Sequence, residues 1–417
     1  MTEALILNSN ERRILVVTCF GHFLSHYNTV VFPALVLPLT QILNLSMTDV
    51  LGLSFWMYLL FGISALPWGV LGDRIGGQLL MILMFLGSGV SGIACAYFME
   101  WPAALSLALA GVGLFSGIYH PIGIGLISTG VSRVSLGMGY NAAFGGLGLV
   151  VAPLLTGLIT WLSGPKAAFI VMGLMNLVGI GLMAKLPLKR PEAVHQQAPE
   201  ENNGAIGAFA TLMVVTMLGG IAFMGSTVIL PTYLELKGQG MLQAVSGSLG
   251  IHLSGNLFAT AVTSVIYVVG MLGQYVGGHV GDRFENRYAY LTFHAICVPA
   301  AFLMAISQNL ALVALAFVYF FFQLGMQAIE NTLVGKLSPR RFRHSAFGLK
   351  FVCTFGVGSL AVKLIQAADA RWGVEATFIT LGSVILLLVM CILLLIYQTS
   401  AYQGLFKVRR EEAYLGT

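Results

Sequence analysis

Histidines and one glutamate lie inside long apolar runs of this sequence, where ionisable groups are unusual. His22 and His26 are four residues apart, which places both imidazoles on one face of a helix, and Thr29 continues that face. An imidazole titrates nearest to neutral pH, so the pair is suited to proton relay or to binding a polar ligand. We therefore predict that these side chains line a cavity, with hydrogen bonding between packed helices as the alternative.

His120 and Glu330 form a second pair, because they correspond when the two parts of the sequence are aligned at an offset of 210 residues. Gln323 and Gln327 precede Glu330 at helical spacing, so three polar side chains follow one face. A carboxylate well inside an apolar run is costly when it is charged and unpaired. We predict a coupling or substrate-binding role for both Glu330 and His120.

Two lysines lie in the apolar run after Glu330 and could supply a counter-charge. Lys350 and Lys363 are thirteen residues apart and point to different faces, so at most one of them should meet a central cavity. We place Lys350 among the candidate site residues. The alternatives are that both lysines snorkel to a membrane surface, or that Glu330 is simply neutralised by Lys350 or Arg343.

A metal ion is a further use for these side chains, and the sequence gives it little support. His22 and His26 could chelate and His120 could complete the set, but no cysteine or acidic residue has suitable spacing. The five cysteines all lie in apolar segments without a C-x-x-C pair. The sequence also lacks a clustered nucleophile and an ATP-binding motif. We therefore expect no metal, no cofactor and no enzymatic activity.

The composition indicates which elements must position these groups. Hydrophobic residues make up 57% and charged residues 9% of the 417 residues, and the mean hydropathy is +0.87. A soluble domain carries about 25% charged residues, whereas runs of about 20 apolar residues cross a lipid bilayer. We predict an all-α integral membrane protein with twelve transmembrane helices. The predicted spans are about 14–41, 49–71, 78–98, 103–129, 135–162, 167–186, 207–235, 256–280, 288–307, 310–337, 345–368 and 374–398.

Polar stretches divide the chain into two halves. We assign 1–186 to the first six-helix half, 187–206 to a cytoplasmic linker, 207–400 to the second six-helix half and 401–417 to a cytoplasmic tail. Sixteen Lys and Arg residues fall on the linker side of the predicted spans and three on the other side, which places both termini in the cytoplasm. We expect a monomer in the inner (plasma) membrane. The net charge of +5 does not indicate a nucleic-acid partner, because the basic residues lie in short loops.

A short charged loop occurs once in each half. Residues 69–77 read G-V-L-G-D-R-I-G-G and residues 278–287 read G-H-V-G-D-R-F-E-N-R, each after the second apolar run of its half. Glycine lets two helices approach closely, and the aspartate can accept hydrogen bonds from a helix N-terminus. Two similar halves around a central site are the architecture of an alternating-access transporter. The residues concerned are Gly69, Asp73, Arg74, Gly278, Asp282 and Arg283.

These loops, the twelve spans and the central linker resemble the major facilitator superfamily over nearly the whole chain. The resemblance implies two pseudo-symmetric six-helix halves whose cytoplasmic ends are gated by the paired Asp-Arg loops. The fifth span is similar to the antiporter motif of the superfamily, which is associated with efflux, although Ala152 and Thr156 stand where that motif has glycines. The matching residues are Gly139, Gly148, Pro153 and Gly157.

Within the superfamily, the first and fourth spans resemble the fosmidomycin resistance group. Residues 21–26 read G-H-F-L-S-H, residues 32–35 read F-P-A-L and residues 119–122 read Y-H-P-I. His26 and Ile122 replace acidic residues of that group. We predict a secondary active transporter of a small organic solute, with protons as the coupling ion and efflux of a drug or metabolite as the direction. Uptake of a small organic acid, with Lys350 as its counter-charge, is the alternative.

Overall fold

The computed structural model describes residues 7–185, 206–338 and 343–400. Every regular element in these ranges is a helix, as the composition predicts. The predicted linker and tail lie outside the described residues, apart from Ile206, which begins a helix. The helices of the first half are α1 (Ser9–Val31), η2 (Pro33–Leu35), α2 (Val36–Leu43), α3 (Met47–Gly52), α4 (Phe55–Ile63), α5 (Ala65–Ile75), α6 (Gly77–Tyr97), α7 (Pro102–Ser116), α8 (Tyr119–Gly130), α9 (Val134–Ser163) and α10 (Pro165–Lys185).

The second half has the same organisation with two additions. A short helix, α12, follows its first span, and a π-helical segment interrupts its fifth span. Its elements are α11 (Ile206–Lys237), α12 (Gln239–Leu249), α13 (Gly255–Arg283), α14 (Asn286–Ile306), α15 (Asn309–Leu337), α16 (Arg343–Phe351), the π-helix η4 (Val352–Gly356), the 3₁₀ turn η5 (Val357–Ser359), α17 (Leu360–Trp372) and α18 (Glu375–Gln398).

The number of spans agrees with the sequence. Within the described ranges, eleven helices are long and apolar enough to cross a bilayer, or twelve when one bent pair counts as a single span. That pair is the second span, in which residues 47–63 and 65–75 meet at 45°. The first span is interrupted as well, because Pro33 opens a 3₁₀ turn between α1 and α2. The α12 helix was not predicted, since it is short and none of its side chains is buried.

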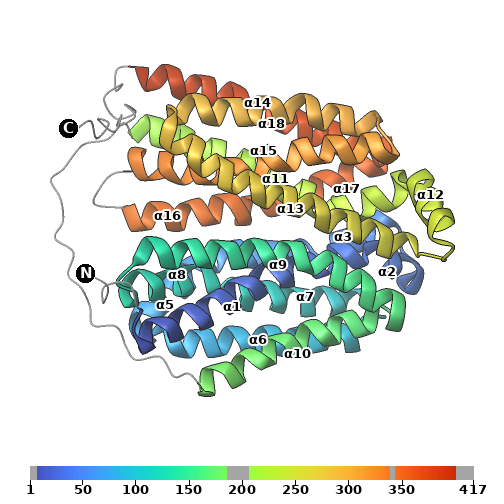
Figure 1. Ribbon diagram of the computed structural model, residues 1–417, viewed down its shortest axis with the longest axis horizontal. Coiled ribbons are helices and arrows are strands. Elements are labelled where there is room, and N and C mark those ends of the chain that lie inside the picture. Colours follow the sequence, from blue (N-terminus) through green and yellow to red (C-terminus); the bar gives the residue numbers. More distant parts are fainter. Residues whose placement is uncertain (1–6, 186–205, 339–342, 401–417) are drawn as a thin grey trace, which may run out of the picture.

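The two halves lie side by side (Figure 1). Helices α1 to α10, coloured blue to green, form one group, and helices α11 to α18, coloured lime to red, form the other. The start of α1, the end of α18 and the two helix ends that flank the linker all lie at the same end of the bundle. The turns that carry Asp73 and Asp282 lie at this end too, because they close α5 and α13 there.

A buried cluster of amides and hydroxyls ties the first half together, and we call it the asparagine lock. Asn28 on α1 exchanges side-chain hydrogen bonds of 3.1 and 2.8 Å with Asn176 on α10. Asn28 also donates to the hydroxyl of Ser116 on α7 at 3.0 Å, which contacts Ser88 on α6 at 3.2 Å. Amides without partners are costly away from water, so this lock fixes four helices relative to one another.

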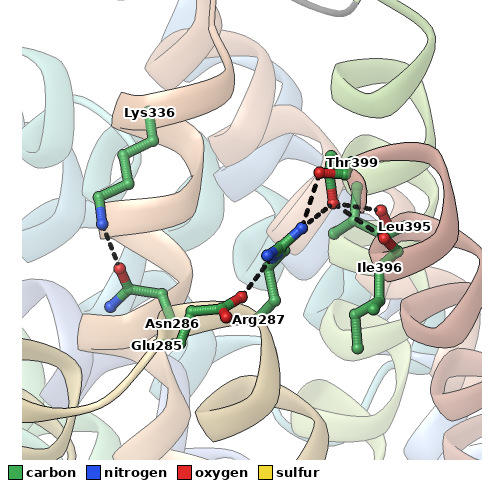
Figure 2. A network of polar contacts seen from close by, with 7 residues as sticks. All are labelled: Glu285, Asn286, Arg287, Lys336, Leu395, Ile396 and Thr399. Carbon is green, nitrogen blue, oxygen red and sulfur yellow. Dashed lines mark hydrogen bonds and ion pairs between the residues drawn. The ribbon is translucent and has the colours of Figure 1, made fainter. Parts of the chain in front are cut away.

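The second half has a polar network of its own at the linker end (Figure 2). Arg287 near the start of α14 is 2% exposed and donates to the carbonyl and the hydroxyl of Thr399 at 2.9 and 2.8 Å. It also forms a 2.5 Å ion pair with Glu285. Lys336 at the end of α15 donates to Asn286 at 2.5 Å. A cation at the C-terminus of α18 is favourable because that end carries unpaired carbonyls, so the network joins three helix ends.

Helix α9 meets α13 of the other half along a close seam. Pro153 lies inside α9 and has no N–H, and the next N–H, that of Leu154, donates to Ser264 Oγ on α13 at 3.0 Å. A Cβ atom at Gly157 would overlap Thr260 on α13. Small residues and a hydroxyl thus let the two halves touch here.

Further contacts between the halves lie at the end of the bundle away from the Asp-Arg loops. Asn256 Nδ2, in the first turn of α13, donates to Ala34 O at 2.7 Å. Gln366 Nε2 on α17 donates to Thr48 O at the start of α3, also at 2.7 Å. Together with the α9–α13 seam, these contacts hold the two halves against each other.

Candidate functional site

A cavity of about 410 Å³ lies between the two halves. Helices α1, α8 and α9 supply its walls on one side, and α11, α13, α15 and the α16–η4 segment supply them on the other. Most of the lining is apolar or glycine, and the polar groups gather in a few places. The polar and charged lining residues are His22, His26, His120, Asn141, Gln274, Gln327, Glu330, Asn331, Lys350 and Thr354.

Three histidines from two helices form the polar wall of the first half, and we call them the histidine triad. The ring centroids of His22 and His26 are 4.9 Å apart, and each lies 5.4 Å from that of His120. The pair at i and i+4 on α1 therefore meets the second residue of α8, as the sequence predicts for a cavity face. Gly145 on α9 leaves room for the cluster, since a Cβ there would overlap the His22 ring.

Aromatic rings of both halves hold His120. It stacks on Phe351 at 4.8 Å and on Phe355 at 5.7 Å, both from the second half. Phe61 meets it edge-on at 5.6 Å from the first half. His120 is 5% exposed, and its Nε2 has no hydrogen-bond partner among the described residues.

A buried ion pair forms the polar wall of the second half. Lys350 Nζ lies 3.0 Å from Glu330 Oε1, and the two residues are 9% and 2% exposed. The hydroxyl of Tyr290 donates to the other carboxylate oxygen of Glu330 at 2.6 Å. Lys350 also donates to Asn331 Oδ1 at 2.5 Å. Both charges are therefore paired and hydrogen-bonded, which is the condition under which buried charges are tolerated.

A comparison with protein-family models identifies a family with this architecture of two six-helix halves. The family model described as the Major Facilitator Superfamily matches residues 18–258 and 248–414. The chain belongs to the Major Facilitator Superfamily. It is therefore a multi-pass membrane protein and a secondary transporter, not an enzyme. No curated protein sequence matches it significantly.

Solved structures of other transporters share the fold at low sequence identity. A bacterial homolog of the human lysosomal transporter Spinster has a TM-score of 0.72 and 13% identity, covering 97% of this chain and 100% of that one. A peptide transporter in complex with sulfate has a TM-score of 0.73 and 15% identity, covering 95% and 96%. A D-xylose-proton symporter has a TM-score of 0.69 and 14% identity, covering 92% and 97%. These likenesses show the Major Facilitator fold and leave substrate and direction open.

The predicted site residues of this Major Facilitator chain divide into those on the cavity and those beyond it. The histidine triad, Gln327, Glu330 and Lys350 line the cavity, and Gln327 accepts a 2.9 Å hydrogen bond from Gln274. Thr29 is not among the lining residues and donates to His26 O at 2.8 Å. Gln323 is also off the cavity and fully buried, and neither of its amide atoms has a partner among the described residues.

Several residues around the site were not predicted from the sequence. Tyr290 hydrogen-bonds to Glu330, and the backbone carbonyl of Asn141 hydrogen-bonds to His22. The rings of Phe351 and Phe355 stack on His120. His294 on α14 is fully buried with its ring 4.7 Å from that of Tyr290, and neither ring nitrogen has a partner among the described residues. The sequence could have identified His294 as a candidate, because it is a histidine in the middle of an apolar run.

The residues predicted to act in gating lie at the linker end, away from the cavity. Asp73, Arg74, Asp282 and Arg283 are exposed, and none of their side chains has a hydrogen bond or ion pair with a described residue. Gly69 lies against Pro121, at 3.4 Å from an added Cβ, whereas nothing is within 4 Å at Gly278. In this conformation, therefore, the paired loops of the Major Facilitator fold do not clamp the described helices.

The fifth-span glycines also differ in their surroundings. A Cβ at Gly148 would overlap the backbone carbonyl of Phe23, so this glycine sets the distance between α9 and α1. Gly157 packs against α13, and Pro153 is buried inside α9. At Gly139 an added Cβ would meet nothing within 4 Å. Gly148 and Gly157 are thus the motif glycines that need to be small, and Gly139 is not under that constraint.

Proposed function

We propose that this transporter couples the efflux of a small amphipathic solute to proton movement, and that Glu330 and Lys350 are the coupling site. The observation that carries the proposal is the ion pair itself, two opposite charges 3.0 Å apart on the wall of a cavity between the halves. Ionisable groups at membrane depth are costly to keep and commonly mark the path of an ion or substrate.

Protonation of Glu330 is the switch in this mechanism. A neutral carboxyl no longer attracts Lys350, so the ammonium is released toward water or toward an anionic group in the cavity. Rocking of the two halves changes the access of Glu330 to each side of the membrane. Proton occupancy then favours one conformation over the other, which is the differential interaction that a gradient needs to drive a cycle. His120 and the other two triad histidines are proposed to share the proton relay.

The direction that we propose is outward. The fifth span is similar to an antiporter motif, and the first and fourth spans are similar to the fosmidomycin resistance group. The mixture of apolar walls with a few polar groups suits an amphipathic drug or metabolite. The apolar walls include Met138, Leu149, Phe223, Met326, Phe351 and Phe355.

We also propose that the protein is a monomer in the inner (plasma) membrane with cytoplasmic termini. The start of α1, the end of α18 and the Asp-Arg loops share one end of the bundle (Figure 1), and basic residues concentrate at that end. On this orientation the linker at 187–206 and the tail at 401–417 are cytoplasmic.

The test is transport in proteoliposomes with and without an imposed pH gradient. The substrate is first found by screening amphipathic cations, neutral drugs and small carboxylates for binding to the purified protein. Glu330→Gln keeps shape and hydrogen bonding but cannot ionise, so it should bind substrate and lose gradient-driven accumulation. Glu375→Gln is the matched control, because Glu375 is also paired with a lysine, Lys237, but lies off the cavity. Accumulation by Glu330→Gln at the wild-type rate would remove Glu330 from the coupling step.

A second candidate function is uptake of a small organic acid. The observation that favours it is Lys350 on the cavity wall, which protonation of Glu330 would free to bind a carboxylate. The two functions differ in a simple measurement on cells. Deleting an exporter raises the cell content of its substrate, whereas deleting an importer lowers it.

A further inference from the structure

We propose that His22, His26 and His120 form a binding site for a borderline divalent transition-metal ion, such as Zn²⁺ or Co²⁺, with one coordination position open to the cavity. The proposal is independent of the coupling role of Glu330, but it replaces the proton relay proposed for the histidine triad, because an imidazole nitrogen that binds a metal cannot also take up a proton. One ligand nitrogen from each of the three side chains lies within 4.8 Å of the other two. A metal has little support in the sequence, because no cysteine or acidic ligand has suitable spacing, but three imidazoles are by themselves a sufficient set for an open site.

The geometry requires only a small closure. Zinc–nitrogen bonds of about 2.0 Å at tetrahedral angles put ligand nitrogens about 3.3 Å apart. A separation of 4.8 Å must therefore shrink by about 1.5 Å. His26 is only half-buried and faces the cavity, so rotation of its side chain provides that movement. Two histidines at i and i+4 on one helix are a recurrent half of such sites.

The hydrogen bond to His22 prepares that ring as a ligand. His22 Nδ1 lies 2.8 Å from the backbone carbonyl oxygen of Asn141. A carbonyl can only accept, so Nδ1 carries the proton and Nε2 keeps its lone pair. A metal-binding histidine usually donates its other N–H to a carbonyl or carboxylate in this way, which fixes the tautomer and the ring. Stacking on Tyr119 at 4.8 Å holds the ring plane further.

His120 supplies the second independent observation. Its Nε2 is buried without a hydrogen-bond partner in the described ranges, and a buried polar atom left in this state is unfavourable. Phe351, Phe355 and Phe61 pack around the ring and offer it no donor or acceptor from their side chains. A metal ion shared with His22 and His26 would satisfy that nitrogen.

The donor set selects the class of ion. Three neutral imidazoles suit zinc, cobalt, nickel or copper and are poor ligands for magnesium or calcium, which prefer oxygen. Imidazoles do not offset the charge of a dication, and Lys350 on the far wall is already paired with Glu330. The open fourth position should therefore hold an anionic donor, either hydroxide or an acidic group of a bound solute.

The experiment uses the full-length, metal-free protein in detergent, after any histidine tag is removed, with Co²⁺ alone as the probe. Tetrahedral nitrogen-ligated Co²⁺ absorbs visible light far more strongly than the hydrated ion, so titration gives both stoichiometry and affinity. We expect one equivalent of Co²⁺ in the wild type and binding weakened by at least about tenfold in His26→Ala. His279→Ala is the matched control, because His279 is exposed and off the cavity. It should bind as the wild type does.

X-ray absorption at the cobalt edge checks the ligands directly. The wild type should show three imidazoles and His26→Ala two. If His26→Ala does not give a monodisperse protein, His26→Gln replaces it, since the glutamine fills similar space. Absence of the visible bands in the wild type would overturn the proposal. Binding by the His26 variants at wild-type strength would overturn it equally.

Discussion

Replacing Lys350 by methionine should destabilise the protein by about 3–4 kcal/mol at pH 7. The substitution keeps the length of the apolar stem and removes the ammonium, so Glu330 is left 2% exposed with its charge uncompensated. Breaking a buried pair from one side typically costs about 3–5 kcal/mol. The hydroxyl of Tyr290 remains at 2.6 Å and recovers a part of this.

Protonation sets an upper limit on the penalty. Glu330 can take up a proton instead of remaining an unpaired anion, and protonating a solvent-exposed glutamate at pH 7 costs about 3.7 kcal/mol, at about 1.36 kcal/mol for each pH unit above about 4.3. The folded variant then binds a proton that the unfolded chain does not bind. Its stability relative to the wild type should therefore recover as the pH falls from 7 toward about 4.3, by up to about 1.4 kcal/mol per unit, and level off below that.

The assay is equilibrium unfolding in mixed detergent micelles at several pH values. Lys363→Met is the matched control on the same span, since Lys363 is exposed and its polar contacts with described residues are those to Gln366 and to the face of Phe55. It should change stability by less than about 0.5 kcal/mol. The double variant Glu330→Gln with Lys350→Met should be more stable than Lys350→Met alone. A loss below about 1 kcal/mol that does not depend on pH would refute the reasoning, because Glu330 would then not depend on Lys350.

Three further outcomes follow from the packing. Arg287→Ala should cost about 1.5–3 kcal/mol in the same unfolding assay, because charge-assisted bonds at the end of α18 are lost; a change under about 0.5 kcal/mol would contradict this. Gly148→Ala should cost about 1–3 kcal/mol by pushing α9 from α1, whereas Gly139→Ala should be neutral or stabilising; equal effects would mean that close approach is not the reason. Asp73→Asn and Asp282→Asn should slow transport without lowering expression, and cross-linking between the linker-side ends of the halves should change; full transport with unchanged cross-linking would exclude a gating role.

The fold was predictable because hydropathy acts over long segments. Twenty apolar residues in a row have few alternatives to a membrane helix, and the paired loops revealed the two halves. The bend in the second span was also predictable, because Pro67 has no N–H for the carbonyl of Ile63, where α4 ends. The close approach of Gly62 to the backbone of Gly356 was not, because it arises only when the two halves meet. Helix α12 was missed because its mixed composition gives no span-length signal.

The site was predictable as far as spacing within one helix reaches. His22 and His26 could be paired from their separation in the sequence. The stacking of Phe351 and Phe355 on His120 could not be predicted, because it forms only when the two halves meet. Gln323 shows a different failure. It shares a helical face with Glu330, yet it lies about 10 Å further along the axis, beyond the end of the cavity. Sequence periodicity gives the direction of a side chain and leaves the depth of a cavity undetermined.

The asparagine lock has a consequence for the assembly of the chain in the bilayer. All of its members belong to the first half, and Asn176 is the last of them to be synthesised. Until α10 is inserted, Asn28 lacks the partner with which it exchanges two hydrogen bonds. Because an unpaired amide is costly in hydrocarbon, α1 is expected to remain near water or the insertion machinery until then. Release of α1 into lipid is then tied to the arrival of the sixth span. The first half can thus complete its folding before α11 leaves the ribosome.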